Sequence, residues 1–119
     1  MTLDRPVLAV GPGEPAGIGP EILHRFRADN PGFRVLAVAD PLLLEGAAKL
    51  LRISTPIGPW QPGDPVLPGE LPCLPVGLAR AAHPGTLDPA NAAYVLESLN
   101  RAVDLVQDGH AAALVTGPV

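Results

Sequence analysis

Cysteine, lysine and long hydrophobic runs are all scarce in this chain of 119 residues. Cys73 is its only cysteine, which excludes an internal disulfide framework and any metal site built from several cysteines. Lys49 is its only lysine and the arginines are scattered, whereas a nucleic-acid-binding protein normally carries a basic patch. Apolar runs such as residues 35–39 are far too short to cross a membrane. We therefore expect a cytoplasmic protein with no nucleic-acid or membrane partner.

Glycine and proline are abundant instead, at 13 and 16 residues, a composition close to that of disordered chains. Apolar residues nevertheless make up 47% of the chain, and the net charge is only −4. A disordered chain would combine few apolar residues with a high net charge, so disorder is excluded. The length suffices for one domain and not for two ordinary ones. We expect residues 1–119 to form a single, loop-rich globular unit.

Short apolar runs alternate with helical segments, which is typical of an α/β/α layered, largely parallel sheet with right-handed crossovers. The Pro-rich segment 54–69 has no periodicity and is interpreted as an ordered surface excursion. The second and fourth strands are almost entirely apolar, so we expect both to be buried on both faces. Because the last strand runs into a turn with nothing after it, the sheet is expected to be truncated. We predict strands at 6–10, 33–39, 71–76 and 112–116, and helices at 20–28, 42–51 and 90–108.

Each predicted helix begins with a small or capping residue followed by proline: Gly19-Pro20, Asp40-Pro41 and Asp88-Pro89. Proline suits the first helical position because its missing N–H would have no helical partner there. An aspartate directly before it can accept hydrogen bonds from the unpaired N–H groups of the first turn. These pairs therefore predict where the helices start.

The third helix carries apolar residues at steps of four and three, the spacing of one helical face. This pattern predicts that the face packs on the sheet while the charged residues face water. Ser98 falls on the predicted polar side, a poor place for a nucleophile. The predicted buried face consists of Ala92, Leu96, Leu99, Val103 and Val106.

The segment Gly11 to Glu21 lies between the first strand and the first helix and is the richest in glycine. Glycine allows positive φ and a close approach of the backbone to a ligand. The helix that follows directs free N–H groups and the positive end of its dipole toward the same place. This loop is therefore the first candidate for a ligand-binding site.

Three interpretations of this loop stay open. Residues 11–16 formally match the G-x-G-x-x-A dinucleotide fingerprint, with Asp40 as a ribose ligand, although two prolines remove N–H donors from the turn. Alternatively, the loop binds another ligand, and Glu14 accepts from its hydroxyl or ammonium group. In the third interpretation the glycines serve only the geometry of a tight turn. A phosphate-binding P-loop is excluded because no Gly-Lys-Ser/Thr follows.

The remaining polar residues form no recognisable constellation. The spacing of His24, His83 and His110 matches no zinc site, and we expect each to be a surface or capping residue. Asn91 lies in the first turn of the third helix, where its amide is expected to cap. From composition and spacing alone, the chain is an α/β ligand-binding unit.

The segment Gly13 to Glu21, GEPAGIGPE, resembles the 4-hydroxythreonine-4-phosphate dehydrogenase family of vitamin B6 biosynthesis. Two departures stand out, since the family usually has threonine at the position of Gly11 and glycine at that of Ala92. The hydroxyl lost at Gly11 is one that could touch a ligand. Three further stretches agree with the family in order and spacing: 39–44, 84–91 and 113–119.

This resemblance implies the isocitrate/isopropylmalate dehydrogenase-like fold and a homodimer that uses NAD and a divalent metal (Zn, Mg or Co). It also implies oxidation of the 3-hydroxyl of 4-phosphooxy-L-threonine, after which the β-keto acid loses carbon dioxide. A divalent metal would polarise the alcohol and stabilise the enolate that decarboxylation produces. The expected partner is therefore a small phosphorylated hydroxy acid. Related members act on phosphorylated four-carbon sugar acids, so the resemblance leaves the exact substrate open.

The family's metal-binding histidines and the basic residues near its substrate lie beyond residue 119. The resemblance covers essentially this whole chain, which corresponds to the N-terminal third of such an enzyme. We expect this chain to be inactive alone. Two alternatives from other classes are a stand-alone Rossmann-type nucleotide-binding module and a non-catalytic remnant that associates through its last strand. The predicted residues of the substrate and cofactor cleft are Gly13, Glu14, Gly17, Gly19, Thr116, Gly117 and Pro118.

Overall fold

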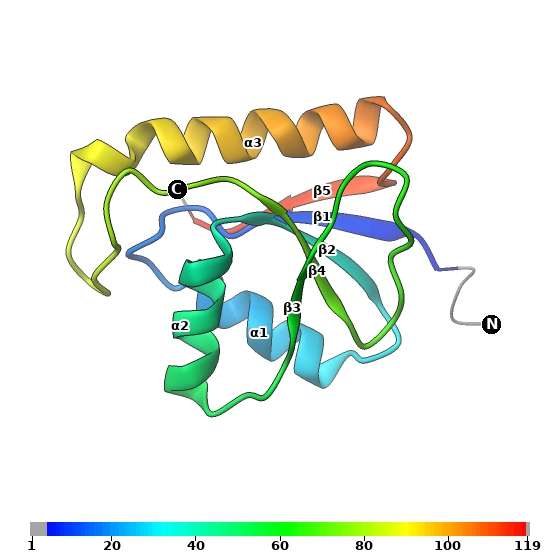
Figure 1. Ribbon diagram of the computed structural model, residues 1–119, viewed down its shortest axis with the longest axis horizontal. Coiled ribbons are helices and arrows are strands. Elements are labelled where there is room, and N and C mark those ends of the chain that lie inside the picture. Colours follow the sequence, from blue (N-terminus) through cyan, green and yellow to red (C-terminus); the bar gives the residue numbers. More distant parts are fainter. Residues whose placement is uncertain (1–4, 119) are drawn as a thin grey trace.

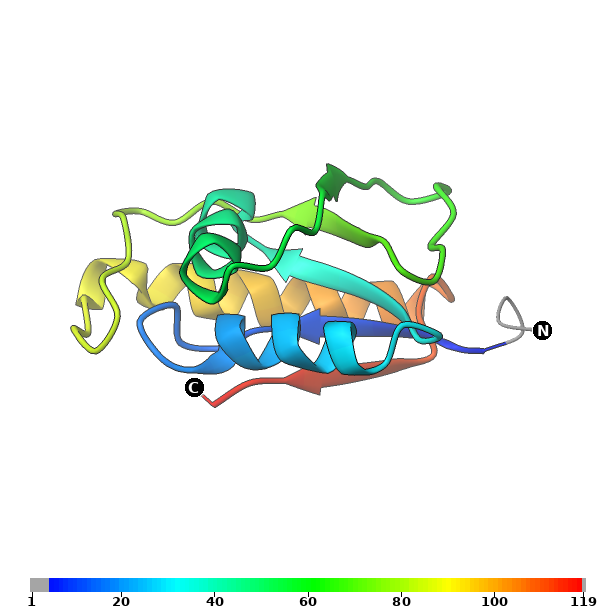
Figure 2. The same ribbon diagram turned by 90° about the horizontal axis from the view of Figure 1, so that it is seen from below.

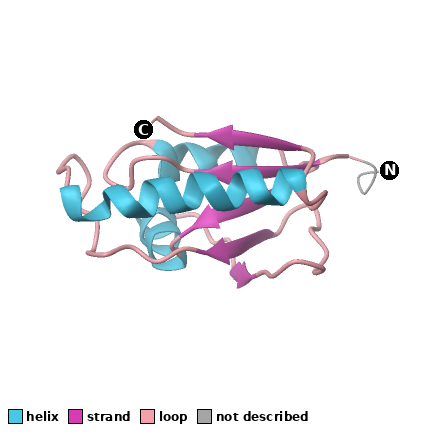
Figure 3. Ribbon diagram, turned by 90° about the horizontal axis from the view of Figure 1, so that it is seen from above, coloured by secondary structure: helices cyan, strands magenta, loops and turns pink. Residues whose placement is uncertain are grey.

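The computed structural model describes residues 5–118, which form one parallel five-stranded sheet in the order β3-β4-β2-β1-β5 (Figure 1). Helix α3 crosses one face of this sheet, while α1 and α2 lie on the other (Figures 2 and 3). The predicted α/β class with helices on both faces is confirmed. The strands are β1 (Val7–Gly11), β2 (Arg34–Ala39), β3 (Ile57–Pro59), β4 (Leu71–Pro75) and β5 (Ala113–Thr116); the helices are α1 (Gly19–Asp29), α2 (Pro41–Leu51), the 3-10 turn η2 (Pro89–Asn91) and α3 (Ala92–Gln107).

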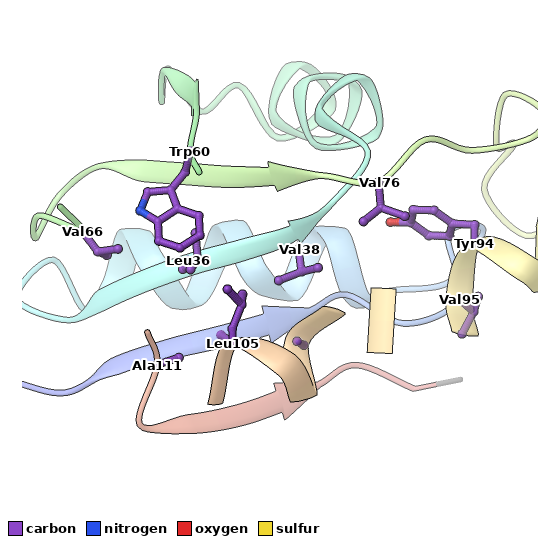
Figure 4. Packing of buried hydrophobic residues seen from close by; sticks show 11 residues of the cluster. Leu36, Val38, Trp60, Val66, Val76, Tyr94, Val95, Leu105 and Ala111 are labelled. Atoms are coloured by element: carbon purple, nitrogen blue, oxygen red, sulfur yellow. The ribbon is translucent and has the colours of Figure 1, made fainter. Parts of the chain in front are cut away.

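Strand β2 lies at the centre of the sheet, and its side chains supply both cores. Successive side chains of a strand point to opposite faces. Leu36 and Val38 therefore pack with Tyr94 and Leu105 of α3 (Figure 4). Val35, Ala37 and Ala39 belong to the second core, together with Leu23 of α1 and Leu44 of α2. An apolar run buried on both faces was expected here, and β2 fulfils that expectation.

The last strand, β5, was also expected to be buried on both faces, and this prediction is wrong. It pairs in parallel with β1, from Leu8 opposite Ala113 to Gly11 opposite Thr116. No other described strand lies along its outer edge, and most of its residues are exposed. An apolar run indicates that a segment suits a buried strand, but it does not indicate how many neighbours the strand has.

The Pro-rich segment 54–69 contains a strand that was not predicted. Strand β3 pairs in parallel with β4 at the other edge of the sheet. An edge strand tolerates Pro59 because a missing N–H on its outer side disrupts no ladder. Directly after it, Trp60 is buried, and its indole N–H donates to the carbonyl oxygen of Asp64 at 2.9 Å. The excursion is therefore anchored to the sheet at its start.

The face of α3 that packs on the sheet differs from the predicted one. Leu96 is 64% exposed and Val103 is 39% exposed. Ser98, expected to face water, is buried, and its hydroxyl donates to the Val38 carbonyl oxygen at 2.6 Å. The helix has two apolar stripes, and small residues on the buried one let it approach the sheet closely. The buried residues are Tyr94, Val95, Ser98, Ala102 and Leu105.

Two leucines on α3 test which stripe stabilises the protein. Leu105→Ala should lower the free energy of unfolding by about 2–5 kcal/mol, because it leaves a cavity in the core. Leu96→Ala, on the exposed stripe, should change it by less than about 0.5 kcal/mol. Urea unfolding of both variants measures the difference. Equal losses would contradict the assigned orientation of the helix.

His24 is buried between α1 and α2, although a surface or capping role was expected. Its Nε2 lies 2.7 Å from the carbonyl oxygen of Leu44, so Nε2 carries the proton and donates. Its Nδ1 has no partner among the described residues. Burial is the main reason that the pKa of His24 lies below the ordinary histidine value; Arg27 also lowers it, and the bond to Leu44 acts in the opposite direction. The folded protein therefore holds this ring neutral.

This neutral ring should make stability depend on pH. Below about pH 6.5, His24 takes up a proton in the unfolded chain but stays neutral in the folded one. The free energy of unfolding therefore decreases as the pH falls from about 6.5 to the lower pKa that His24 has in the folded protein. Urea unfolding at about pH 7.5 and about pH 5.5 measures the change. His24→Gln keeps an N–H donor without titrating and should flatten the dependence. His83→Gln, on an exposed residue, should leave the dependence intact; a flattening there as well would refute the assignment.

Candidate functional site

The glycine-rich loop and the turn after β5 meet at the carboxyl ends of two neighbouring strands. Open α/β sheets bind their ligands at this end. The N–H of Glu14 donates to the Pro118 carbonyl oxygen at 2.9 Å, and the N–H of Gly117 donates to that of Gly11 at 2.8 Å. The structure thus brings together the two segments predicted to form a cleft, although they are far apart in the sequence. Their contact with a ligand stays a prediction.

Three of the predicted cleft glycines lie where backbone segments touch one another. A Cβ on Gly19 or on Gly117 would overlap the Pro12 carbonyl oxygen. A Cβ on Gly13, whose φ is +84°, would overlap the Pro118 carbonyl oxygen. Only glycine permits this approach. These contacts favour the interpretation in which the glycines serve the geometry of the turn.

The other predicted cleft residues are more accessible. Gly17 is exposed, and its N–H donates to the Glu14 carbonyl oxygen at 3.0 Å. The half-buried side chain of Glu14 accepts from the N–H of Ala16 at 3.2 Å, so the carboxylate braces its own loop. Thr116 is exposed at the end of β5. The accessible members of the predicted set are Glu14, Gly17, Thr116 and Pro118, the last of which is also exposed.

Asp40 caps α2, as its position before Pro41 predicted. One carboxylate oxygen accepts from the N–H of Leu42 and the other from that of Leu78, both at 2.9 Å. Each oxygen thus already has a backbone partner, and the cap on α2 accounts for Asp40 without a ribose. Together with the packed glycines, this arrangement favours the structural interpretation of the loop over the Rossmann one.

A cavity of about 780 Å³ opens beside the loop, between the start of α1, helix α2 and the segment 78–85. Its walls are mainly apolar, and Ile18, Leu42 and Leu50 line it while remaining largely exposed. Binding pockets are commonly apolar with a few polar groups. The sequence did not predict this cavity, because residues 78–83 have no periodicity and the stretches 39–44 and 84–91 come together only in the folded chain.

Asn91, expected to cap α3, instead holds the segment 78–85 in place. Its side-chain oxygen accepts from the N–H of Arg80, and its side-chain nitrogen donates to the Arg80 carbonyl oxygen, each at 3.1 Å. Asn91 is only 3% exposed. The N–H of Gly85 donates to the Ala16 carbonyl oxygen at 2.9 Å and fixes the same segment to the glycine-rich loop. One wall of the cavity is therefore attached at both ends.

Residues 5–118 offer little for other kinds of site. In this part of the chain, no three histidine, cysteine, aspartate or glutamate side chains are grouped as metal ligands. Burial raises the pKa of Cys73 to about 11, and its thiol donates to the Ala39 carbonyl oxygen at 3.3 Å, so the group is a poor nucleophile. None of the described helices combines the length and apolarity that a bilayer crossing requires.

A family model described as "Pyridoxal phosphate biosynthetic protein PdxA" matches residues 32–119. The chain belongs to the PdxA family. Proteins named 4-hydroxythreonine-4-phosphate dehydrogenase match it at 44% identity in Chromobacterium violaceum and at 46% in Xanthomonas oryzae pv. oryzae, over 97% and 96% of this chain. This chain spans only 35% of the length of each of these relatives.

Solved structures agree with the PdxA assignment at the level of the fold. A 4-hydroxythreonine-4-phosphate dehydrogenase from Burkholderia phymatum superposes with a TM-score of 0.83 at 24% identity, over 94% of this chain and 36% of that one. The Klebsiella pneumoniae enzyme of the same name gives a TM-score of 0.82 at 23% identity, over 95% and 37% of the two chains. The family model and the two relatives, and not the solved structures, confirm the expected resemblance to this family.

Two glycines test whether the contact with the Pro12 carbonyl fixes the glycine-rich loop. Gly19→Ala should lower the free energy of unfolding by at least about 1–3 kcal/mol, because the new methyl group meets the Pro12 carbonyl. Gly46→Ala, inside α2 with no atom near its Cβ position, should raise it by about 0.5–1 kcal/mol. Thermal unfolding compares the two. If Gly19→Ala left the free energy of unfolding unchanged, the loop would be free to shift.

Proposed function

We propose that this chain is the N-terminal part, a single partial domain, of an enzyme of pyridoxal phosphate biosynthesis. The complete enzyme would oxidise 4-phosphooxy-L-threonine with NAD and release carbon dioxide from the product. Membership of the PdxA family carries this proposal, because the relatives that match nearly the whole chain are named for this dehydrogenase activity. A cytoplasmic homodimer is part of the same proposal and rests on the family resemblance.

In this proposal the chain supplies a wall of the cleft. Glu14 and Gly17 lie in the loop after β1, and Thr116 ends β5. Open α/β sheets bind their ligands at this end of the strands. The packed glycines keep that wall rigid, which favours the positioning of reacting groups. A half-buried Glu14 carboxylate can accept a hydrogen bond from a hydroxyl or ammonium group of a substrate.

Among the described residues, neither cofactor of the proposed reaction finds a complete set of ligands. Residues 5–118 contain no group of side chains that could hold the divalent metal. Asp40, the candidate ribose ligand for NAD, uses both carboxylate oxygens to bind backbone N–H groups. We therefore place the metal ligands and the main cofactor contacts in the part of the enzyme that lies outside this chain, and we expect the chain alone to be inactive.

A fusion protein tests the proposed function. This chain should replace the matching N-terminal segment of the Chromobacterium violaceum relative, and NADH formation should be followed with 4-phosphooxy-L-threonine, NAD and a divalent metal. The fusion should form NADH, because the chain supplies the wall that the rest of the enzyme lacks. This chain alone, and the remainder of the relative alone, serve as controls and should form none.

Two results would contradict the proposal in different ways. A folded fusion that forms no NADH would refute the assigned activity. NADH formation by the isolated chain would instead refute the claim that the essential cofactor contacts lie outside it. Circular dichroism of the fusion establishes that it is folded before either conclusion is drawn.

A further inference from the structure

Strand β5 forms one edge of the sheet, and its sequence does nothing to protect that edge. Natural sheet edges commonly carry charged residues or proline, or are very short, and these devices prevent pairing with another chain. The opposite edge follows this rule, because β3 has three residues and ends with Pro59. Strand β5, in contrast, has four residues, none of which is charged or proline. Its outer edge is therefore suited to pairing.

The pairing of β5 with β1 shows which backbone groups lie on this outer edge. The N–H of Ala112, just before β5, donates to the Val7 carbonyl oxygen of β1 at 2.8 Å. Successive residues of a strand direct their backbone groups to opposite neighbours. The N–H and carbonyl groups of Ala113 and Val115 therefore point away from β1, and both residues are exposed.

Helix α3 turns an apolar flank toward the same edge. Four of its apolar residues each directly follow a residue buried against the sheet, which places them about 100° further around the helix. In Figure 3, α3 lies in front of the sheet and runs opposite to the strands, with β5 along the upper edge. In this orientation a right-handed helix turns toward β5 at each such step. The residues of this flank are Leu96, Leu99, Val103 and Val106.

The two flanks of α3 differ in chemistry. Glu97, Arg101 and Asp104 each directly precede a buried residue, so they lie on the flank that faces away from β5. That flank is suited to water. On the flank toward β5, Leu96 and Val103 are exposed although they are apolar. Apolar residues gathered on one side of a helix, with charged residues on the other, indicate a surface that another element covers.

The spacing of the elements indicates what kind of partner would cover both features. Helix α3 lies above β1 and also packs on β2 and β5. Packed helices are about 8–10 Å apart, and neighbouring strands are about 5 Å apart. A helix seated on the apolar flank therefore lies above a strand added to β5. Two copies of this chain paired through β5 would instead hold their α3 helices about three strand spacings apart, too far to cover the two flanks.

We propose that the outer edge of β5 and the apolar flank of α3 form one docking surface for the part of the enzyme that this chain lacks. That part adds a strand to β5 and packs an amphipathic helix against α3. The inference rests on the proposed function. The chain spans 35% of the length of relatives that match nearly all of it, so most of such an enzyme is available to cover this surface.

Hydrogen exchange of backbone amides tests the added strand. It is measured on the 119-residue chain alone and on its fusion to the remainder of the Chromobacterium violaceum relative. The N–H groups of Ala113 and Val115 should exchange at least about a hundredfold more slowly in the fusion, because there each donates to the added strand. The N–H of Leu114 points to β1 and is the internal control, which should be protected in both proteins.

A charge on the apolar flank tests the docked helix. Leu96→Glu should lower the melting temperature of the fusion by about 5 °C or more, because it buries a carboxylate against that helix. In the isolated chain, where Leu96 is exposed, the shift should be less than about 2 °C. Ala93→Glu, exposed on α3 outside the flank, is the matched control and should shift both proteins by less than about 2 °C. Equal shifts for Leu96→Glu in the two proteins would contradict the docked helix.

The exchange rates also identify the occupant of the surface. Protection of Ala113 and Val115 in the isolated chain that increases with protein concentration would mean that a second copy pairs with β5, and would overturn the assigned partner. An equimolar mixture of the chain with the remainder of the relative gives the same measurement without a covalent link. Fast exchange of both N–H groups in the fusion and in this mixture would overturn the docking surface.

The NADH assay of the fusion separates this inference from the proposed function. A fusion that protects Ala113 and Val115 but forms no NADH would refute the assigned activity and leave the docking surface in place. An active fusion in which both N–H groups exchange fast would refute the docking surface and leave the activity in place.

Discussion

The closeness of the Pro12 carbonyl to the backbones of Gly19 and Gly117 is the constraint on which the site depends. It joins the loop after β1, the start of α1 and the turn after β5 with no side chain between them. The interior of a protein is as densely packed as an organic crystal, so such a crossing has little freedom to shift. The carboxyl end of the sheet is therefore built on a rigid backbone junction.

A rigid junction explains how the remaining polar groups are used. Carboxylates such as Asp40 and Asp88 cap helices and hold neighbouring loops, and the buried amide of Asn91 fastens the outer wall of the cavity. These groups satisfy backbone atoms that would otherwise be left without partners, which would be costly. What remains accessible is small: parts of the glycine-rich loop, the apolar walls of the cavity and Arg80.

Local patterns in the sequence predicted most of the elements, and the errors share one physical cause. The Asp-Pro pairs located two helix starts because the capping interactions involve neighbours in the chain. The exposed β5, the buried His24 and the face of α3 that packs on the sheet depend on which element comes to lie alongside, and no local pattern records this. The loop was found from its glycines, whereas Arg80 and Asn91 meet only through the folded segment between them.

The strand order has a consequence for how this protein folds during synthesis. Strand β1 forms early in the chain and soon meets β2, but its other neighbour, β5, lies close to the opposite end. Pairing residues so distant in sequence requires closure of a long loop, and such topologies fold slowly. One edge of β1 must therefore stay unpaired until β5 has left the ribosome. In that interval the exposed edge of β1 can pair with a neighbouring molecule, unless a chaperone covers it or β5 is synthesised soon enough.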